Sequence, residues 1–234
     1  MHSAAVDRTP GLSRPWHGVL AVVVAAALVT QLVLVFSGGS TAGAGGATGD
    51  EADALTRLVR TLSYFTIQSN ILVLACTVSL VLRPGRDGPG WRVLRLDALL
   101  GITITGLVFA IVLAPQIHLE GVSLWVTVGL HYVAPPMTLL GWLLFGPRGR
   151  IDAVSVGWAF VWPALWIAYT LVHGAVTDWY PYPFLDVHAR GYGLALRNIV
   201  GVLAVAGLLA WLFAWIDRRL GRRLKRPLPL PSRF

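Results

Sequence analysis

A threonine and a histidine, each inside a long apolar segment, are the residues of this chain best suited to chemistry. Thr66 belongs to YFTIQSN (64–70), and His131 belongs to LHYVAPPMTLLGW (130–142). A threonine hydroxyl is a poor nucleophile unless a base takes its proton, and imidazole is the side chain most often used as that base. The two segments therefore suggest nucleophilic catalysis by a threonine and a histidine.

Several polar residues accompany Thr66. On a helix, Ser63, Thr66 and Asn70 fall at i, i+3 and i+7, and Ser69 follows Thr66 by three positions, so all four share one face, whereas Gln68 points elsewhere. A lone serine or threonine usually bonds a neighbouring helix or its own i−4 carbonyl. A cluster on one face predicts instead a polar lining inside a helical bundle, in which Ser69 and Asn70 are candidate supporting residues and oxyanion donors by position.

His131 is an ionisable residue within an apolar run, which in a membrane is a functional hypothesis by default. The alternative is a structural histidine bonded to a neighbouring carbonyl. Thr127 lies one turn earlier on the same face and could orient the ring. Pro135 and Pro136 cannot donate backbone hydrogen bonds, so we expect the helix to kink or open near His131 and to free carbonyl groups there.

The elements that hold these residues are membrane spans. Of 234 residues, 56% are hydrophobic and 13% are charged. Six apolar runs approach the roughly 20 residues that a helix needs to cross about 30 Å of hydrocarbon, and helices pair their own backbone groups in lipid. We predict an all-α, polytopic membrane protein, a bundle of six transmembrane helices at about 16–36, 61–82, 93–114, 122–145, 153–173 and 198–216.

Charge distribution predicts the orientation. Fifteen of the 19 Lys and Arg residues fall in the tails and the even-numbered loops, so both termini are expected in the cytoplasm. The tail 1–15 and the basic tail 217–234 flank the transmembrane domain 16–216. The basic tail is interpreted as contacting anionic lipid headgroups rather than nucleic acid. One lysine among eighteen arginines, with abundant Ala, Gly and Val, favours a bacterial cytoplasmic (inner) membrane.

Depth in the membrane links Thr66 to His131. With cytoplasmic termini, the second and fourth spans both run inward, and the two residues lie five and nine positions past the span starts. At about 1.5 Å per residue, their depths differ by only about 6 Å. A meeting of the two side chains in the outer part of the membrane is therefore geometrically allowed.

Two segments outside the predicted spans have recognisable patterns. Residues 50–60 (DEADALTRLVR) are interpreted as an amphipathic turn leading into the second span. Residues 174–198 are interpreted as a long outer loop, in which Tyr180, Tyr182 and Phe184 alternate with prolines. These aromatic residues form either a lid or wall of a site or an ordinary interfacial belt.

Three motifs in this order, YFTIQSN, HYVAPPMTLL and WYPYPFLD, resemble the bacterial Pr-six-Pr membrane proteins. Those proteins are similar to the eukaryotic androgen-induced and androgen-dependent tissue-factor-pathway-inhibitor-regulating proteins. The resemblance covers roughly residues 61–216. It implies an intramembrane hydrolase of fatty acid esters of hydroxy fatty acids, with Thr66 as nucleophile and His131 as base, and it gives the YPFL segment no chemical role.

The sequence departs from the family pattern around both residues, since the surroundings of Thr66 are more polar and two prolines follow His131. The substrate is therefore open, beyond a lipid ester that reaches the site laterally. No cofactor or metal is expected, and no carboxylate is placed to orient His131, because Asp97 is expected to pair with Arg95. Two alternatives remain: a non-catalytic lipid-binding protein or transporter, and a haem or metal site formed by His131 and His173. The single cysteine, Cys76, allows no intrachain disulfide.

Overall fold

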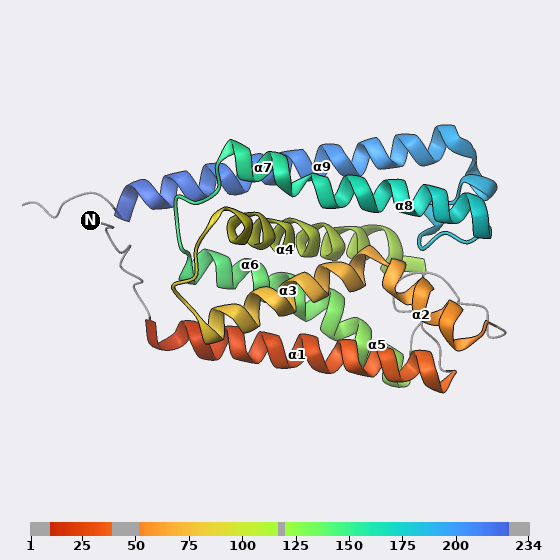
Figure 1. Cartoon of the computed structure of the whole chain (residues 1–234), viewed down its shortest axis with the longest axis horizontal. Helices are drawn as coiled ribbons and strands as arrows, with labels where there is room; N and C mark the ends of the chain where they lie inside the picture. Colours follow the sequence, from red (N-terminus) through yellow and green to blue (C-terminus); the bar gives the residue numbers. More distant parts are fainter. Residues whose placement is uncertain (1–9, 39–51, 117–119, 225–234) are drawn as a thin grey trace, which may run out of the picture.

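The computed structural model describes residues 10–38, 52–116 and 120–224, and within these ranges the chain is helical without strands (Figure 1). Six helical segments are long and apolar enough to cross a membrane, which confirms the predicted all-α, six-span architecture. They are Gly11–Ser37, Phe65–Leu82, Pro89–Gln116, Gly121–Phe145, Ala153–Thr177 and Val187–Arg222. The start of α1 (Pro10–Ser37) and the end of α9 (Val187–Leu224) lie at one end of the bundle, called here the terminus end. The opposite end, called the loop end, carries α2 (Ala54–Ser63).

The second span begins later than its apolar run suggests. The predicted amphipathic segment forms α2, which Asp53 caps by accepting a hydrogen bond from the backbone N–H of Thr56 at 3.0 Å. The extended conformation of Tyr64 (φ −69°, ψ 127°) then interrupts the helix before α3 (Phe65–Leu82) begins. Ser63 therefore ends α2 and does not share a helix face with Thr66, contrary to the expectation from spacing.

The third and fourth spans each contain a wider, π-helical turn. The third span passes from α4 (Pro89–Val108) through a π-helix (Phe109–Leu113) to a short 3-10 turn (Ala114–Gln116). The fourth passes from α5 (Gly121–Thr127) through a π-helix (Val128–Val133) to α6 (Ala134–Phe145). The distortion expected near His131 is this second π-helix, and such turns are frequent at functional sites.

The double proline explains a free carbonyl beside His131. The N–H of Ala134 bonds the carbonyl of Gly129, five residues back, so it no longer serves the carbonyl of Leu130. The next residue in the π pattern is Pro135, which has no N–H to offer Leu130. The Leu130 carbonyl is thus available to a side chain from another helix.

The predicted loop 174–198 is wrong in extent. The fifth span consists of α7 (Ala153–Ala159) and α8 (Val161–Thr177), and residues 178–186, with a 3-10 turn at Pro183–Leu185, lead from it to α9 at Val187. A non-helical break at Gly191 (φ 76°, ψ 156°) separates the short first segment of α9 from the rest of that helix. The Asp186 carboxylate caps α9 by accepting from the N–H of Ala189 at 2.9 Å. Hydropathy locates only the apolar part of a helix and misses such polar first turns.

At its other end α9 continues through Asp217, whose carboxylate accepts from the backbone N–H groups of Arg150 and Ile151 at 2.6 and 2.9 Å. The first part of the predicted basic tail is therefore helix, while residues 1–9 and 225–234 of the two predicted tails lie outside the described residues. The side of the membrane that each end faces stays a prediction.

The core of the bundle is built from α1, α3, α4 and α6, with α4 packed against α3, α6, α7 and α9 (Figure 1). Within the third span 61% of the most apolar window is buried, against 17% for the fifth and 28% for the sixth. The fifth and sixth spans are thus peripheral. Tryptophan side chains join α8 to α2 and α3: the indole N–H of Trp166 donates to the Ser63 carbonyl at the end of α2, and that of Trp162 donates to the Gln68 side chain of α3, both at 2.9 Å.

Candidate functional site

Thr66 lies in the first turn of α3 because the helix restarts after Tyr64. Backbone N–H groups in a first turn have no partner within the helix. The N–H of Thr66 instead donates to the hydroxyl oxygen of Tyr182, 3.2 Å away in the segment between α8 and α9. The break at Tyr64 thus brings a nucleophile candidate to the positive end of a helix dipole.

The structure brings Thr66 and His131 together. Thr66 Oγ1 lies 3.3 Å from His131 Nε2, and the two residues are only 3% and 4% exposed. His131 Nδ1 lies 3.2 Å from the backbone carbonyl of Thr127. A carbonyl can only accept, so Nδ1 carries the proton of the neutral ring and Nε2 is left to accept the Thr66 hydroxyl.

Two further contacts fix the His131 ring. Phe109, from the π-helix of the third span, stacks on it with ring centroids 4.0 Å apart and planes 28° apart. Thr127 orients the ring through its carbonyl and not through its hydroxyl, which is buried without a hydrogen-bond partner. The Thr127 carbonyl and the Phe109 ring therefore hold the imidazole. The carbonyl takes the position at Nδ1 that a carboxylate has in many catalytic triads.

Tyr182 contributes a second hydroxyl. Its oxygen lies 3.3 Å from Thr66 Oγ1. Because the Thr66 proton points at His131, the Tyr182 hydroxyl must be the donor in this contact. Burial raises the pKa of the Tyr182 phenol, which keeps the group protonated as a donor. The alternation of aromatic residues and prolines identified Tyr182 only as a lid or wall, and no pattern in the sequence indicated that its hydroxyl would reach Thr66.

The other two aromatic residues of this segment have separate places. Phe184 stacks on Tyr182 with centroids 5.2 Å apart and lines the adjoining cavity. Tyr180 is buried, but its hydroxyl has no hydrogen-bond partner, and its ring fills the space above Gly174. Of the three residues, only Tyr182 places a polar atom on Thr66.

Asn70 and Ser69 are buried beside Thr66 but support the backbone and a neighbouring helix. Asn70 Nδ2 donates to the carbonyl of Thr66 at 2.9 Å and to that of Leu130 at 3.3 Å. The second bond uses the carbonyl that Pro135 leaves free, so it ties the nucleophile helix to the His131 helix. Ser69 Oγ accepts from Thr105 Oγ1 of α4 at 3.4 Å. With both amide hydrogens engaged, Asn70 is not available as an oxyanion donor in this arrangement.

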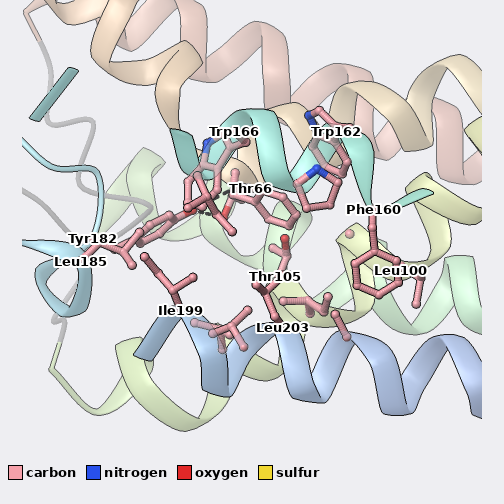
Figure 2. Close-up of a pocket in the computed structure, with 18 of the residues that line it drawn as sticks. Thr66, Leu100, Thr105, Phe160, Trp162, Trp166, Tyr182, Leu185, Ile199 and Leu203 are labelled. Carbon is pink, nitrogen blue, oxygen red and sulfur yellow. Dashed lines mark hydrogen bonds between the residues drawn. The ribbon is translucent and has the colours of Figure 1, made fainter. Parts of the chain in front are cut away.

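An apolar cavity adjoins Thr66 between α3, α4, α8 and α9 (Figure 2). It holds about 850 Å³ of empty volume, part of it open to the surroundings. Thr66 and Tyr182 are on its wall, and the rest is mostly aliphatic and aromatic, including Phe65, Leu100, Ile104, Trp162, Trp166, Leu185, Ile199 and Leu203. Such a surface accommodates hydrocarbon chains.

The remaining predicted pairings have different outcomes. Asp97 does not pair with Arg95, so that expectation is wrong: Arg95 donates to the carbonyl of Gly146 at 2.8 Å, and Asp97 is among the residues that line the apolar cavity. His131 and His173 have different surroundings, since His173 contacts Tyr169 and Trp179. Within the described ranges no three His, Cys, Asp or Glu residues are grouped to hold a metal ion.

Comparisons of the chain with protein-family models, curated proteins and solved structures find no match. The family resemblance and the catalytic roles of Thr66 and His131 therefore stay predictions.

Proposed function

We propose that this protein is an intramembrane lipid ester hydrolase with Thr66 as nucleophile and His131 as general base. The observation that carries the proposal is a directed series of hydrogen bonds at the wall of an apolar cavity: Tyr182 to Thr66, Thr66 to His131, and His131 to the Thr127 carbonyl. A hydroxyl that donates to an otherwise unprotonated imidazole nitrogen is the arrangement that activates a hydroxyl nucleophile.

In the first half-reaction, Thr66 Oγ1 attacks the ester carbonyl carbon while its proton passes to His131 Nε2. The carbonyl oxygen becomes an oxyanion. As Thr66 Oγ1 bonds to carbon, the Tyr182 hydroxyl turns its single proton from Oγ1 to this oxyanion, which the positive end of the α3 dipole also stabilises. The bond between the carbonyl carbon and the leaving oxygen then breaks. His131 returns the proton to that oxygen, so an alcohol leaves and an acyl-threonine remains.

In the second half-reaction, a water molecule attacks the acyl-threonine and gives a proton to His131 Nε2. The tetrahedral intermediate collapses by breaking the bond to Thr66 Oγ1, which recovers its proton from His131. The products are a carboxylic acid and the original enzyme. The Thr127 carbonyl holds Nδ1–H throughout, so the same nitrogen serves in both steps.

The cavity supports a membrane lipid as the substrate class. Its walls are apolar, and two of them come from α8 and α9, which belong to the two least buried spans. A lipid can reach Thr66 laterally by parting these peripheral helices. The same cavity would also suit a non-catalytic lipid-binding protein or transporter, and what favours the hydrolase is the activated hydroxyl on its wall.

Labelling with a fluorophosphonate probe tests the proposal on purified protein in detergent. We expect the wild type to react, Thr66→Ala to lose labelling and His131→Ala to lose most of it. Ester turnover in these variants should fall by at least about a thousandfold, as for other nucleophile and base deletions. Thr138→Ala is a matched control, because the Thr138 hydroxyl bonds only the Ala134 carbonyl within its own helix. His173→Ala is the matched histidine control.

Equal labelling of wild type and Thr66→Ala would overturn the assignment of the nucleophile. Absence of hydrolysis, together with lipid binding that survives in Thr66→Ala, would favour the lipid-binding alternative. A Soret band in the purified protein that disappears in His173→Ala would favour the haem alternative.

A further inference from the structure

Asp97 is a buried carboxyl group that the proposed reaction does not use. It lies on α4, it is among the residues that line the same cavity as Thr66, and it is only 8% exposed. Oδ1 is buried without a hydrogen-bond partner, and among the described residues no ion pair includes Asp97. Burying a polar group without a partner is unfavourable, so this position calls for a partner that the chain itself does not supply.

The position of Asp97 relative to Thr66 follows from α4. Thr105 lies beside Thr66 in Figure 2 and bonds Ser69 of the same helix as Thr66. Asp97 precedes Thr105 by eight residues, or about 12 Å along the helix axis. Leu100 and Phe160, which line the cavity with Asp97, lie at the far end of Figure 2 from Tyr182.

The cavity therefore has two polar ends joined by an apolar wall. Thr66 and Tyr182 form the end nearer the loop end of the bundle, and Asp97 forms the end nearer the terminus end. The gap between them suits a medium-length acyl chain. A simple alkyl terminus would fill the apolar wall but would leave Asp97 without a partner.

We propose that Asp97 binds a hydroxyl group at the far end of an acyl chain whose ester carbonyl is held at Thr66. The inference rests on the proposed function, because it takes the ester end of the ligand to lie at Thr66. A hydroxyl satisfies Asp97 in either protonation state, since it donates to a carboxylate and accepts from a carboxylic acid. An ammonium group would instead bring a full charge into an apolar cavity. The substrate class is thus an ester of a medium-chain ω-hydroxy fatty acid.

Competition binding tests this inference without turnover. Decanoate and ω-hydroxydecanoate, free acids that correspond to hydrolysis products, would compete with radiolabelled decanoate on the full-length protein in detergent. In the wild type we expect ω-hydroxydecanoate to bind about tenfold more tightly, a difference of about 1.4 kcal/mol. In Asp97→Leu the order should reverse, because the ligand hydroxyl is then buried without a partner. Asp97→Asn should retain the preference, and so should the exposed control Asp178→Leu.

A series of wild-type measurements covers the case in which Asp97→Leu does not fold. The advantage of a terminal hydroxyl should be greatest at one intermediate chain length and should disappear for shorter chains that cannot reach Asp97. An equal affinity for hydroxylated and plain acids at every length would overturn the inference, as would a hydroxyl preference that persists in Asp97→Leu.

The experiment also separates this inference from the hydrolase proposal. Thr66→Ala should keep the hydroxyl preference while losing turnover. A wild type that prefers the hydroxylated acid but hydrolyses no ester would retain the Asp97 site and reject the hydrolase. A wild type that hydrolyses plain and ω-hydroxylated esters equally well and binds both acids equally would support the hydrolase and reject the Asp97 site.

Discussion

Tyr182→Phe is the substitution that best isolates the chemistry of the site from its packing. Phenylalanine keeps the ring that stacks on Phe184 and meets Tyr64 edge to face, with centroids 5.2 and 5.6 Å away. It removes only the hydroxyl that contacts Thr66 Oγ1 and accepts the Thr66 backbone N–H. Any change in activity then reports on one oxygen and its proton.

The magnitude follows from the two hydrogen bonds lost. Loss of the acceptor for the Thr66 N–H should lower the free energy of unfolding by about 1 kcal/mol. Loss of one oxyanion donor typically lowers kcat by about 10²- to 10³-fold, and KM should change little because the apolar cavity is intact. Burial raises the pKa of this phenol, so the ratio of wild-type to variant kcat should stay constant across the neutral pH range.

Tyr180→Phe supplies the matched control. Its hydroxyl is buried without a partner, so its removal should leave kcat unchanged and should not lower the melting temperature. Initial rates on a medium-chain ester and thermal unfolding in the same detergent measure both quantities. If Tyr182→Phe kept the wild-type kcat, or if both variants lost the same activity, the assigned role of the Tyr182 hydroxyl would be wrong.

Three further predictions concern stability and are all read by thermal unfolding. Asn70→Ala should lower the free energy of unfolding by about 1 to 3 kcal/mol, because two buried carbonyl groups lose their donor; an unchanged melting temperature would show that these bonds contribute nothing. Gly174→Ala should cost about 1 to 3 kcal/mol, since its new Cβ would lie 2.1 Å from the Tyr180 ring, whereas Gly157→Ala, which meets nothing within 4 Å, should be neutral or stabilising. The hydrogen bond from Arg92 lowers the pKa of Asp87 below its ordinary value of 3.8, so the contribution of Asp87 is fully present above that pH and disappears as the pH falls below it. Asp87→Asn should therefore cost about 0.5 kcal/mol at neutral pH, and this cost should vanish in acid; a cost that grows on acidification would contradict the assignment.

The parts of the fold that follow from hydropathy could be predicted from the sequence. Six apolar runs defined six spans, and the double proline indicated the distortion beside His131. The break at Tyr64 could not be predicted, because nothing in its side chain forbids a helix and its extended conformation depends on tertiary contacts. The first segment of α9, before the break at Gly191, was missed because Asp186, His188 and Arg190 interrupt the apolar signal.

In the site, too, features set within a single span could be predicted, and contacts between distant segments could not. Depth along two helices was enough to anticipate that Thr66 and His131 could meet, since each residue needs only its own span to place it. The reach of the Tyr182 hydroxyl depends on how residues 178–186 fold back over α3. The unpaired state of Asp97 depends on where Arg95 points, and neighbours in sequence suggested the opposite pairing. Contacts between segments far apart in the chain are what the sequence pattern lacks.

Trp162 and Trp166 of α8 line the apolar cavity beside Thr66 and contact α2 and α3 across it. Their indole N–H groups bond Gln68 and the Ser63 carbonyl, and Trp162 also stacks on Phe65 with centroids 4.6 Å apart. The two indole rings therefore keep α8 at a distance from α2 and α3. The volume open to a ligand should therefore change with the size of the side chains at positions 162 and 166, in natural variation or by engineering.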